Sequence, residues 1–262
     1  MGLPIIDISF KQLAKSAVVR SQRGIVALIL KDTAKTSLTV FDEGDIPSSL
    51  KKENQGLIKD VLKGSPNKIE LYVLGTEGQI SEALTYFEGV EFNLMCMPSA
   101  ETSDATAIKT FIKKMNDVVK YKCDAIIAND KADSEAMINY TAKNIVVNGE
   151  SVTTANHTAR IAGLIEGTPL NQSITFATLS DVDAIENLTK EQADTRIDNG
   201  ELILVREMGK VRVARGVNSL TTLTDIKGKA FQKIKLRKNT LILENTLCAD
   251  IIENKNSCHG II

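Results

Sequence analysis

Residues that could perform covalent hydrolysis are scarce in this sequence. A serine or cysteine nucleophile needs a base within hydrogen-bond reach, normally histidine, and the 262 residues include only two histidines, His157 and His259. No Gly-x-Ser-x-Gly motif places a serine on a strand-to-helix turn. His157 follows Thr154 and Asn156 at the start of a predicted helix, so we interpret it as a polar surface or capping residue. The sequence therefore predicts no catalytic residue.

Motifs for metal and phosphate binding are also missing. Cys248, Cys258 and His259 cluster, but the nine residues between the two cysteines match no zinc-binding spacing. Neither Gly-x-x-x-x-Gly-Lys-Ser/Thr nor Gly-x-Gly-x-x-Gly occurs, and Gly167 is interpreted as the carboxy-cap of a helix. We therefore predict no cofactor, no metal and no enzymatic activity.

Charge is nearly balanced in this chain. The net charge is -1, from 32 basic and 33 acidic residues, so no overall field attracts nucleic acid or an anionic membrane. Aromatic residues make up 4% of the chain and Trp does not occur, which argues against stacking platforms for single-stranded nucleic acid. We predict neither a nucleic-acid partner nor a membrane partner.

Four basic residues gather on one predicted β-hairpin, in which strands at 202–207 and 210–215 flank Met208-Gly209. Composition favours a solvated strand face. The alternative is a contact with an acidic neighbouring protein, where such charges contribute specificity more than affinity. These possible interface charges are Arg206, Lys210, Arg212 and Arg215. The carboxylates form no pair spaced for acid–base chemistry, and Asp181 and Asp183 are interpreted as cap or turn residues.

The segments that carry these residues alternate between predicted helix and predicted strand. Apolar runs without a polar face indicate buried strands, and amphipathic segments between them indicate helices. Buried strands separated by helices predict an α/β fold with a mostly parallel sheet covered on both faces. Strands are expected at 24–30, 69–74, 92–97, 123–128 and 144–147, and helices after Ser48 or Ser49, over 80–88, after Asp104, after Asp133 or Ser134, over 154–165 and over 189–199.

The amino terminus has a different pattern from the rest of the chain. Ile6, Ile8 and Phe10 alternate with polar residues, as in a half-buried strand, and a polar stretch at 11–23 separates them from the first buried strand. We therefore expect an arm. The sequence has no signal peptide and no apolar run long enough to span a bilayer, which predicts a cytoplasmic protein with reduced cysteines unless it leaves within an assembly.

Longer motifs resemble a known family. The first is TARIAGLIEGTPLNQS at 158–173, and the second combines GELILVRE at 200–207 with VRVARGVNSLT at 211–221. GLPIIDISF at 2–10 and RGIVA at 23–27 look like the opening of the same family. Together these segments closely resemble contractile phage tail sheath proteins, especially the small sheaths of PBSX-like defective prophages and clostridial diffocin-type bacteriocins.

The resemblance implies a structural role and a subtilisin-like core topology without protease activity. Sheath subunits of this family stack as rings around a tail tube, and they contract by rigid-body rearrangement. Their terminal arms add strands to sheets of neighbouring subunits, which assigns Ile6, Ile8 and Phe10 to inter-subunit pockets. The implied partners are other sheath subunits, the tail tube protein and the baseplate. The implied location is the cytoplasm during assembly and then the virion or a tail-like particle.

The expected domain organisation has four parts: a linking arm at 1–23, a small α/β region at 24–90, the sheath core at 91–235 and a tail at 236–262. Relatives continue after the match at 231–235 with a further α/β domain, to which the tail does not align. We hypothesise that this domain is truncated, through a frameshifted or interrupted reading frame. Two other readings stay open: a non-assembling sheath remnant or interaction module, and an α/β hydrolase with an unrecognised motif.

Overall fold

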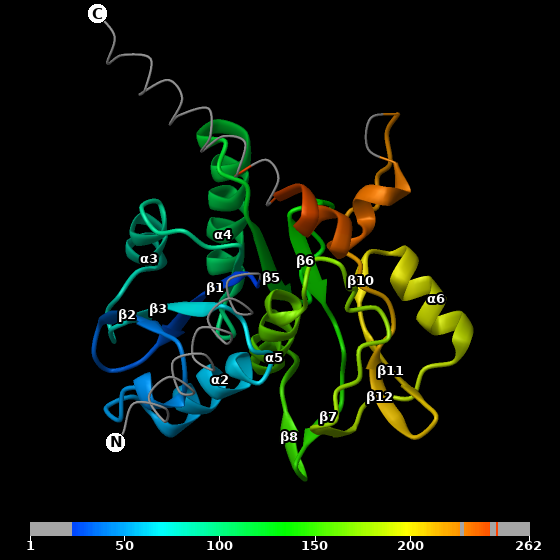
Figure 1. The fold of residues 1–262 in the computed structure, drawn as a ribbon, viewed down its shortest axis with the longest axis horizontal. Helices are drawn as coiled ribbons and strands as arrows, with labels where there is room; N and C mark the ends of the chain where they lie inside the picture. The colour runs from blue at the N-terminus through cyan, green and yellow to red at the C-terminus, as the bar shows by residue number, and fades with distance from the viewer. Residues whose placement is uncertain (1–22, 226–227, 242–244, 246–262) are drawn as a thin grey trace, which may run out of the picture.

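A seven-stranded sheet forms the centre of the computed structural model, which describes residues 23–225, 228–241 and 245. The strand order is β2-β3-β1-β4-β5-β6-β10, and every neighbouring pair is parallel except β2 with β3 (Figure 1). The predicted α/β fold with a mostly parallel sheet is confirmed. The strands are β1 (Ile25–Lys31), β2 (Thr36–Val40), β3 (Lys68–Leu74), β4 (Leu94–Cys96), β5 (Asp124–Ala128), β6 (Met137–Tyr140) and β10 (Glu201–Leu202).

Strand β1 shows why the sheet needs cover on both faces. Its side chains are almost all buried, and successive side chains of a strand point to opposite faces. Val26 and Leu28 therefore belong to one hydrophobic cluster, and Ala27 and Ile29 belong to the other. A strand with two apolar faces is stable only between two layers of helices.

Helices supply those two layers. Helices α2 (Lys52–Leu62) and α5 (Thr154–Gly167) pack against each other and against β1, and their apolar side chains join the first cluster. Helices α3 (Ile80–Phe87) and α4 (Thr102–Lys114) pack together, and their apolar side chains join the second. One face of the sheet is thus covered by two helices far apart in sequence, and the other by two consecutive helices.

Backbone atoms of α2 and α5 come close together because three glycines stand at the contact. A β-carbon added to Gly163 would meet the carbonyl oxygen of Val61 at 2.1 Å, and one added to Gly167 would meet that of Gly64 at 1.6 Å. The interpretation of Gly167 as a carboxy-cap is therefore wrong. Gly167 ends the helix itself, Thr168 is the cap, and the missing side chain permits the close approach.

The start of α2 also differs from the prediction, since neither Ser48 nor Ser49 caps it. The helix begins at Lys52, because a turn that starts at Pro47 precedes it. The side chain of Asp32 accepts a hydrogen bond from the Lys51 amide (2.9 Å) just before the helix. The sequence beside α2 does not reveal this hydrogen bond, because Asp32 lies 19 residues earlier, directly after β1.

No helix follows Asp133 or Ser134, where one was expected. Strand β6 forms there instead, because the side chain of Asp133 accepts hydrogen bonds from the amides of Thr221 (2.6 Å) and Thr222 (2.9 Å), far along the chain. These bonds hold the segment before β6 in a loop. The predicted strand at 144–147 does form, but outside the central sheet.

Two small antiparallel sheets accompany the central sheet. One has the order β8-β7-β9, and the other is the predicted hairpin of β11 and β12, which is confirmed. Helix α6 begins after a Thr189 cap and ends before Gly200, whose φ of +72° suits glycine. The elements are β7 (Ile145–Val147), β8 (Glu150–Val152), β9 (Val182–Ala184), β11 (Leu204–Glu207), β12 (Lys210–Val213), α6 (Lys190–Asp198) and the short helical turns η1 (Glu43–Asp45), η2 (Met115–Val119) and η3 (Lys229–Gln232).

Residues 234–241 are helical, and two of their cationic side chains lie in the protein interior. Arg237 pairs with Asp124 at 3.0 Å, and Lys238 pairs with Glu166 at 3.2 Å; all four side chains are buried. Burial raises the pKa of Asp124 to about 6, although Arg237 opposes the shift. Removing one partner of such a pair leaves a buried charge without compensation, so these pairs fasten the segment to the sheet.

The domain division stays a prediction. The helical residues 234–241 cross the expected boundary after 235. Helix α2, within the expected region 24–90, packs against α5, within the expected core 91–235. The arm at 1–23 and most of the tail at 236–262 lie outside the described residues.

Gly163→Ala should destabilise the protein, because the added methyl group would collide with backbone rather than with a movable side chain. We expect a loss of about 3 kcal/mol in the free energy of unfolding, at the upper end for overpacking. Gly56→Ala is the matched control: Gly56 lies in α2 with open space around it, and the substitution should stabilise by about 0.8 kcal/mol. Urea denaturation measures both, and a stabilised Gly163→Ala variant would contradict the close contact.

Candidate functional site

The four predicted interface cations do not share one strand face. In the hairpin, Arg206 lies opposite Val211, and Val205 lies opposite Arg212. Because paired residues share a face, Arg206 lies on one side of the hairpin and Arg212 on the other, with Lys210. Arg215 follows β12. Arg206, Lys210 and Arg215 are exposed, whereas Arg212 is half-buried and its Nε makes no hydrogen bond to a described residue.

The tip of the hairpin carries an exposed apolar side chain between two of these cations. Met208 is 91% exposed, and Arg206 and Lys210 stand on either side of the turn. Neither cation forms an ion pair with a residue that the structure describes. A protruding methionine flanked by charge has the composition of a contact surface, but whether it meets a partner stays a prediction.

The predicted arm residues Ile6, Ile8 and Phe10 lie outside the described residues. Their role in joining subunits therefore also stays a prediction.

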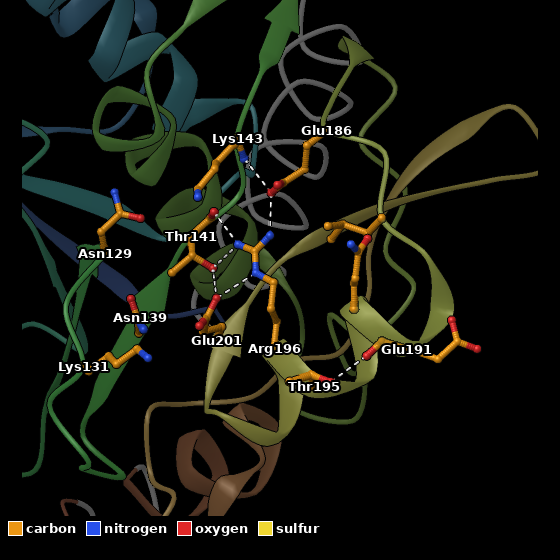
Figure 2. A pocket seen from close by; sticks show the side chains of 12 residues that line it. Asn129, Lys131, Asn139, Thr141, Lys143, Glu186, Glu191, Thr195, Arg196 and Glu201 are labelled. Atoms are coloured by element: carbon orange, nitrogen blue, oxygen red, sulfur yellow. Dashed lines mark hydrogen bonds and ion pairs between the residues drawn. The ribbon is translucent and has the colours of Figure 1, made fainter.

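A cavity of about 670 Å³ opens where β5 and β6 end. Asn129 follows β5, Asn139 and Thr141 come from β6 and its end, and Glu201 comes from β10 (Figure 2). This edge of a parallel sheet is where α/β proteins commonly bind ligands. The side-chain amide of Asn139 is buried, and neither its nitrogen nor its oxygen forms a hydrogen bond with a described residue.

Arg196 of α6 lines this cavity, and its guanidinium forms hydrogen bonds with other residues of the chain. Its guanidinium donates to Glu186 (2.7 Å), to Glu201 (2.8 Å) and to the carbonyl oxygen of Thr141 (2.6 Å), as Figure 2 shows. Burial lowers the pKa of Arg196, but the bonds to both carboxylates outweigh it and the net shift is upward. The Arg196 guanidinium therefore connects α6 to the end of β6 and to β10, and it is not suited to acid–base chemistry. Sequence reasoning missed it, because its partners come from three separate segments.

His157 is buried, so its interpretation as a surface or capping residue is wrong. Its Nδ1 shares a hydrogen bond with the hydroxyl of Tyr140 (2.6 Å), inside the core beside β6. Burial, followed by the charge of Arg160, lowers the pKa of His157 to about 4, so the ring is neutral at pH 7. Burial raises the pKa of the Cys96 thiol to about 12, so this buried cysteine is not a thiolate nucleophile.

The remaining candidates for chemistry also have structural partners. Asp181 forms a two-bond pair with Arg160 (2.8 and 3.2 Å), and Asp183 accepts a hydrogen bond from the Gly149 amide (2.8 Å). No group of three His, Cys, Asp or Glu side chains among the described residues could hold a metal ion. Within the same part of the chain, no helix has the length and apolarity needed to cross a membrane.

Comparisons with known proteins agree on one family. Residues 75–219 match the family described as "Phage tail sheath protein central domain". The chain is also 46% identical over 243 residues to the tail sheath protein of Clostridium phage phiCD119, an alignment that covers 90% of this chain and 68% of that protein. This chain belongs to the phage tail sheath family.

Two further similar proteins extend the comparison. The chain is 27% identical over 246 residues to the phage-like element PBSX protein XkdK of Bacillus subtilis, covering 92% of this chain and 51% of XkdK. The crystal structure of the sheath tail protein Lin1278 from Listeria innocua has the same fold, with a TM-score of 0.80, 16% identity, and coverage of 94% and 82%. The predicted resemblance to contractile-tail sheaths, PBSX-like ones included, is confirmed at the level of the family. The chain spans about two thirds of the clostridial relative and about half of XkdK.

The stability of the sheath chain should depend on pH through His157. A histidine whose pKa falls from 6.5 to about 4 on folding stabilises the protein fully above pH 6.5 and loses this contribution as the pH drops towards 4. His157→Gln removes the titration. Between pH 7 and pH 4 the native chain should therefore lose up to about 3 kcal/mol more than the variant.

Urea unfolding at a series of pH values measures this difference. Asp124 titrates in the same range, but its contribution is common to both proteins and cancels. Parallel pH profiles would contradict a neutral, buried His157.

Proposed function

We propose that this chain is a structural subunit that polymerises around a tail tube and contracts to drive the tube through a target envelope. The observation that carries this proposal is the 46% identity over 243 residues to a tail sheath protein. Its proposed partners are other copies of the chain, the tail tube protein and the baseplate. The proposed place of assembly is the cytoplasm, followed by a virion or tail-like particle.

A rigid interior supports motion as one body. The glycine contact between α2 and α5 leaves little room for sliding, and the Arg237–Asp124 pair ties residues 234–241 to β5. Close-packed interiors transmit displacement rather than deform. Contraction then consists of whole subunits changing neighbours, with the energy stored at assembly in a metastable packing.

Absence of catalysis is part of the same proposal. The buried histidine is neutral, and burial raises the pKa of both described cysteines, Cys96 and Cys123. These properties favour a packing role for all three residues. The two family relatives compared above are phage or phage-like proteins, one of them a tail sheath protein by name.

Contacts between subunits are proposed at two places. The arm at 1–23 adds a strand to a neighbouring sheet, with Ile6, Ile8 and Phe10 filling pockets. At the hairpin tip, Arg206 and Lys210 meet an acidic surface of a neighbour and, as rim charges, govern the rate and salt dependence of association. Many weak identical joints then act together.

Assembly tests the proposal directly. The chain is co-expressed with a cognate tail tube protein and examined by electron microscopy. Ordered tubular polymers are expected. Persistent monomers would contradict the proposal and favour the alternative of a non-assembling sheath remnant.

The alternation of apolar and polar residues in the predicted arm provides a second test. Ile6→Ser with Ile8→Ser should prevent tubular polymers, because the apolar face that fills the pockets is lost while the backbone can still form a strand. Asp7→Asn with Ser9→Ala is the matched control on the opposite face and should leave assembly unchanged. Equal defects in both pairs, measured as polymer yield by sedimentation, would contradict the face-specific contact.

A further inference from the structure

The cavity at the ends of β5 and β6 is lined by a buried side chain that has no partner in the described fold. Asn139 lies in β6 between Ile127 of β5 and Glu201 of β10, and it is only 1% exposed. The nitrogen of its side-chain amide can donate two hydrogen bonds and the oxygen can accept two, yet neither atom bonds a described residue. A buried amide without hydrogen bonds destabilises a fold, and a polar ligand in the cavity would supply them.

The polar groups beside this amide do not serve it, because they bond to one another. The Glu201 carboxylate accepts hydrogen bonds from the Thr141 hydroxyl (2.9 Å) and from Arg196 (2.8 Å). The Glu186 carboxylate also accepts one from Arg196 (2.7 Å). Arg196 and its two carboxylates therefore satisfy each other, and the Asn139 amide remains available to a ligand.

Two cations on the same side of the cavity also lack a partner of opposite charge. Lys131 and Lys143 are exposed, line the cavity and form no ion pair with any residue that the structure describes. Figure 2 shows both lysines on the side of Arg196 where Asn139 lies, and Glu191 on the opposite side. A ligand beside the buried amide thus meets two ammonium groups, which favour an anion such as a carboxylate.

The lining of the cavity selects among anionic ligands. A volume of about 670 Å³ can hold a small ligand or a short segment of polypeptide, but Leu188 is the only apolar residue that lines it. A nucleobase would find no aromatic side chain to stack on. Inorganic phosphate would use the lysines and leave the Asn139 amide without hydrogen bonds. A peptide group has one donor and one acceptor that match those of the amide, so a polypeptide with carboxylates uses both features.

We propose that this cavity binds an acidic polypeptide segment of a partner protein. One peptide group donates its N–H to the Asn139 side-chain oxygen and accepts a hydrogen bond from the Asn139 side-chain nitrogen. A carboxylate of the segment forms charge-assisted hydrogen bonds with the ammonium groups of Lys131 and Lys143. The site goes beyond the proposed function, since neither the arm nor the hairpin takes part in it.

Ligand-observed NMR with the full chain measures the binding of blocked pentapeptides, which carry no terminal charge. The acidic probe is acetyl-Gly-Glu-Gly-Glu-Gly-amide, and the neutral control has glutamine in place of both glutamates. Glutarate is the second control, because it has two carboxylates but no peptide group. The acidic peptide should bind about tenfold more tightly than either control, since each control lacks one of the two interactions.

Two variants separate the two interactions. Asn139→Leu should weaken binding of the acidic peptide about tenfold and raise the melting temperature, because it removes a buried amide without hydrogen bonds. Lys131→Gln with Lys143→Gln should weaken the acidic peptide about tenfold and leave the neutral peptide unchanged. The matched control is Lys52→Gln with Lys113→Gln, two exposed lysines that do not line the cavity, and it should leave binding unchanged.

Several results would overturn the inference. These are equal binding of the acidic peptide and its controls, unchanged binding by either variant, or an equal loss in the variant with Lys52 and Lys113 replaced. A lower melting temperature of Asn139→Leu would show that the amide is satisfied within the fold and would also overturn it. Phosphate binding that depends on Lys131 and Lys143 but not on Asn139 would instead assign the cavity to a bare anion.

Discussion

The fold depends on a close backbone contact between α2 and α5. Because Gly163, Gly167 and Gly64 have no side chains, the two helices lie near enough to cover one face of the central sheet together. That cover is what permits β1 to be apolar on both sides. Segments from the first quarter of the chain and from its middle thereby share one hydrophobic cluster.

Local patterns predicted most of the sheet, because each strand and helix is specified by its own run of residues. β1, β3, β5, the hairpin, α5 and α6 appear close to where periodicity places them. The errors arose where a distant residue decides the local structure. Asp133 is held by Thr221 and Thr222, and the amide before α2 is held by Asp32. Nothing in the neighbouring sequence reports those bonds.

The surfaces proposed for function were predicted less well, and for a similar physical reason. Arg206 and Lys210 were recognised as part of a charged hairpin, but alternation across the two strands separates the four charges that composition had grouped. Arg215 instead shares a groove with Lys229 and Lys233, which lie beyond the hairpin in sequence. Only the tertiary fold brings these cations together. In the same way, burial of His157 depends on the sheet beside it rather than on its helical position.

The buried pairs of residues 237 and 238 have a consequence for biosynthesis. Asp124 and Glu166 are made long before Arg237 and Lys238 leave the ribosome, so the nascent chain must wait for the cations that compensate these two carboxylates. Domains generally fold as units, with the earlier parts of the chain emerging first. The two carboxylates therefore gain their compensating cations only when residues 234–241 have been synthesised. The buried ion pairs, and with them the packing of residues 234–241 against the sheet, therefore form only when nearly the whole of the described chain has been synthesised.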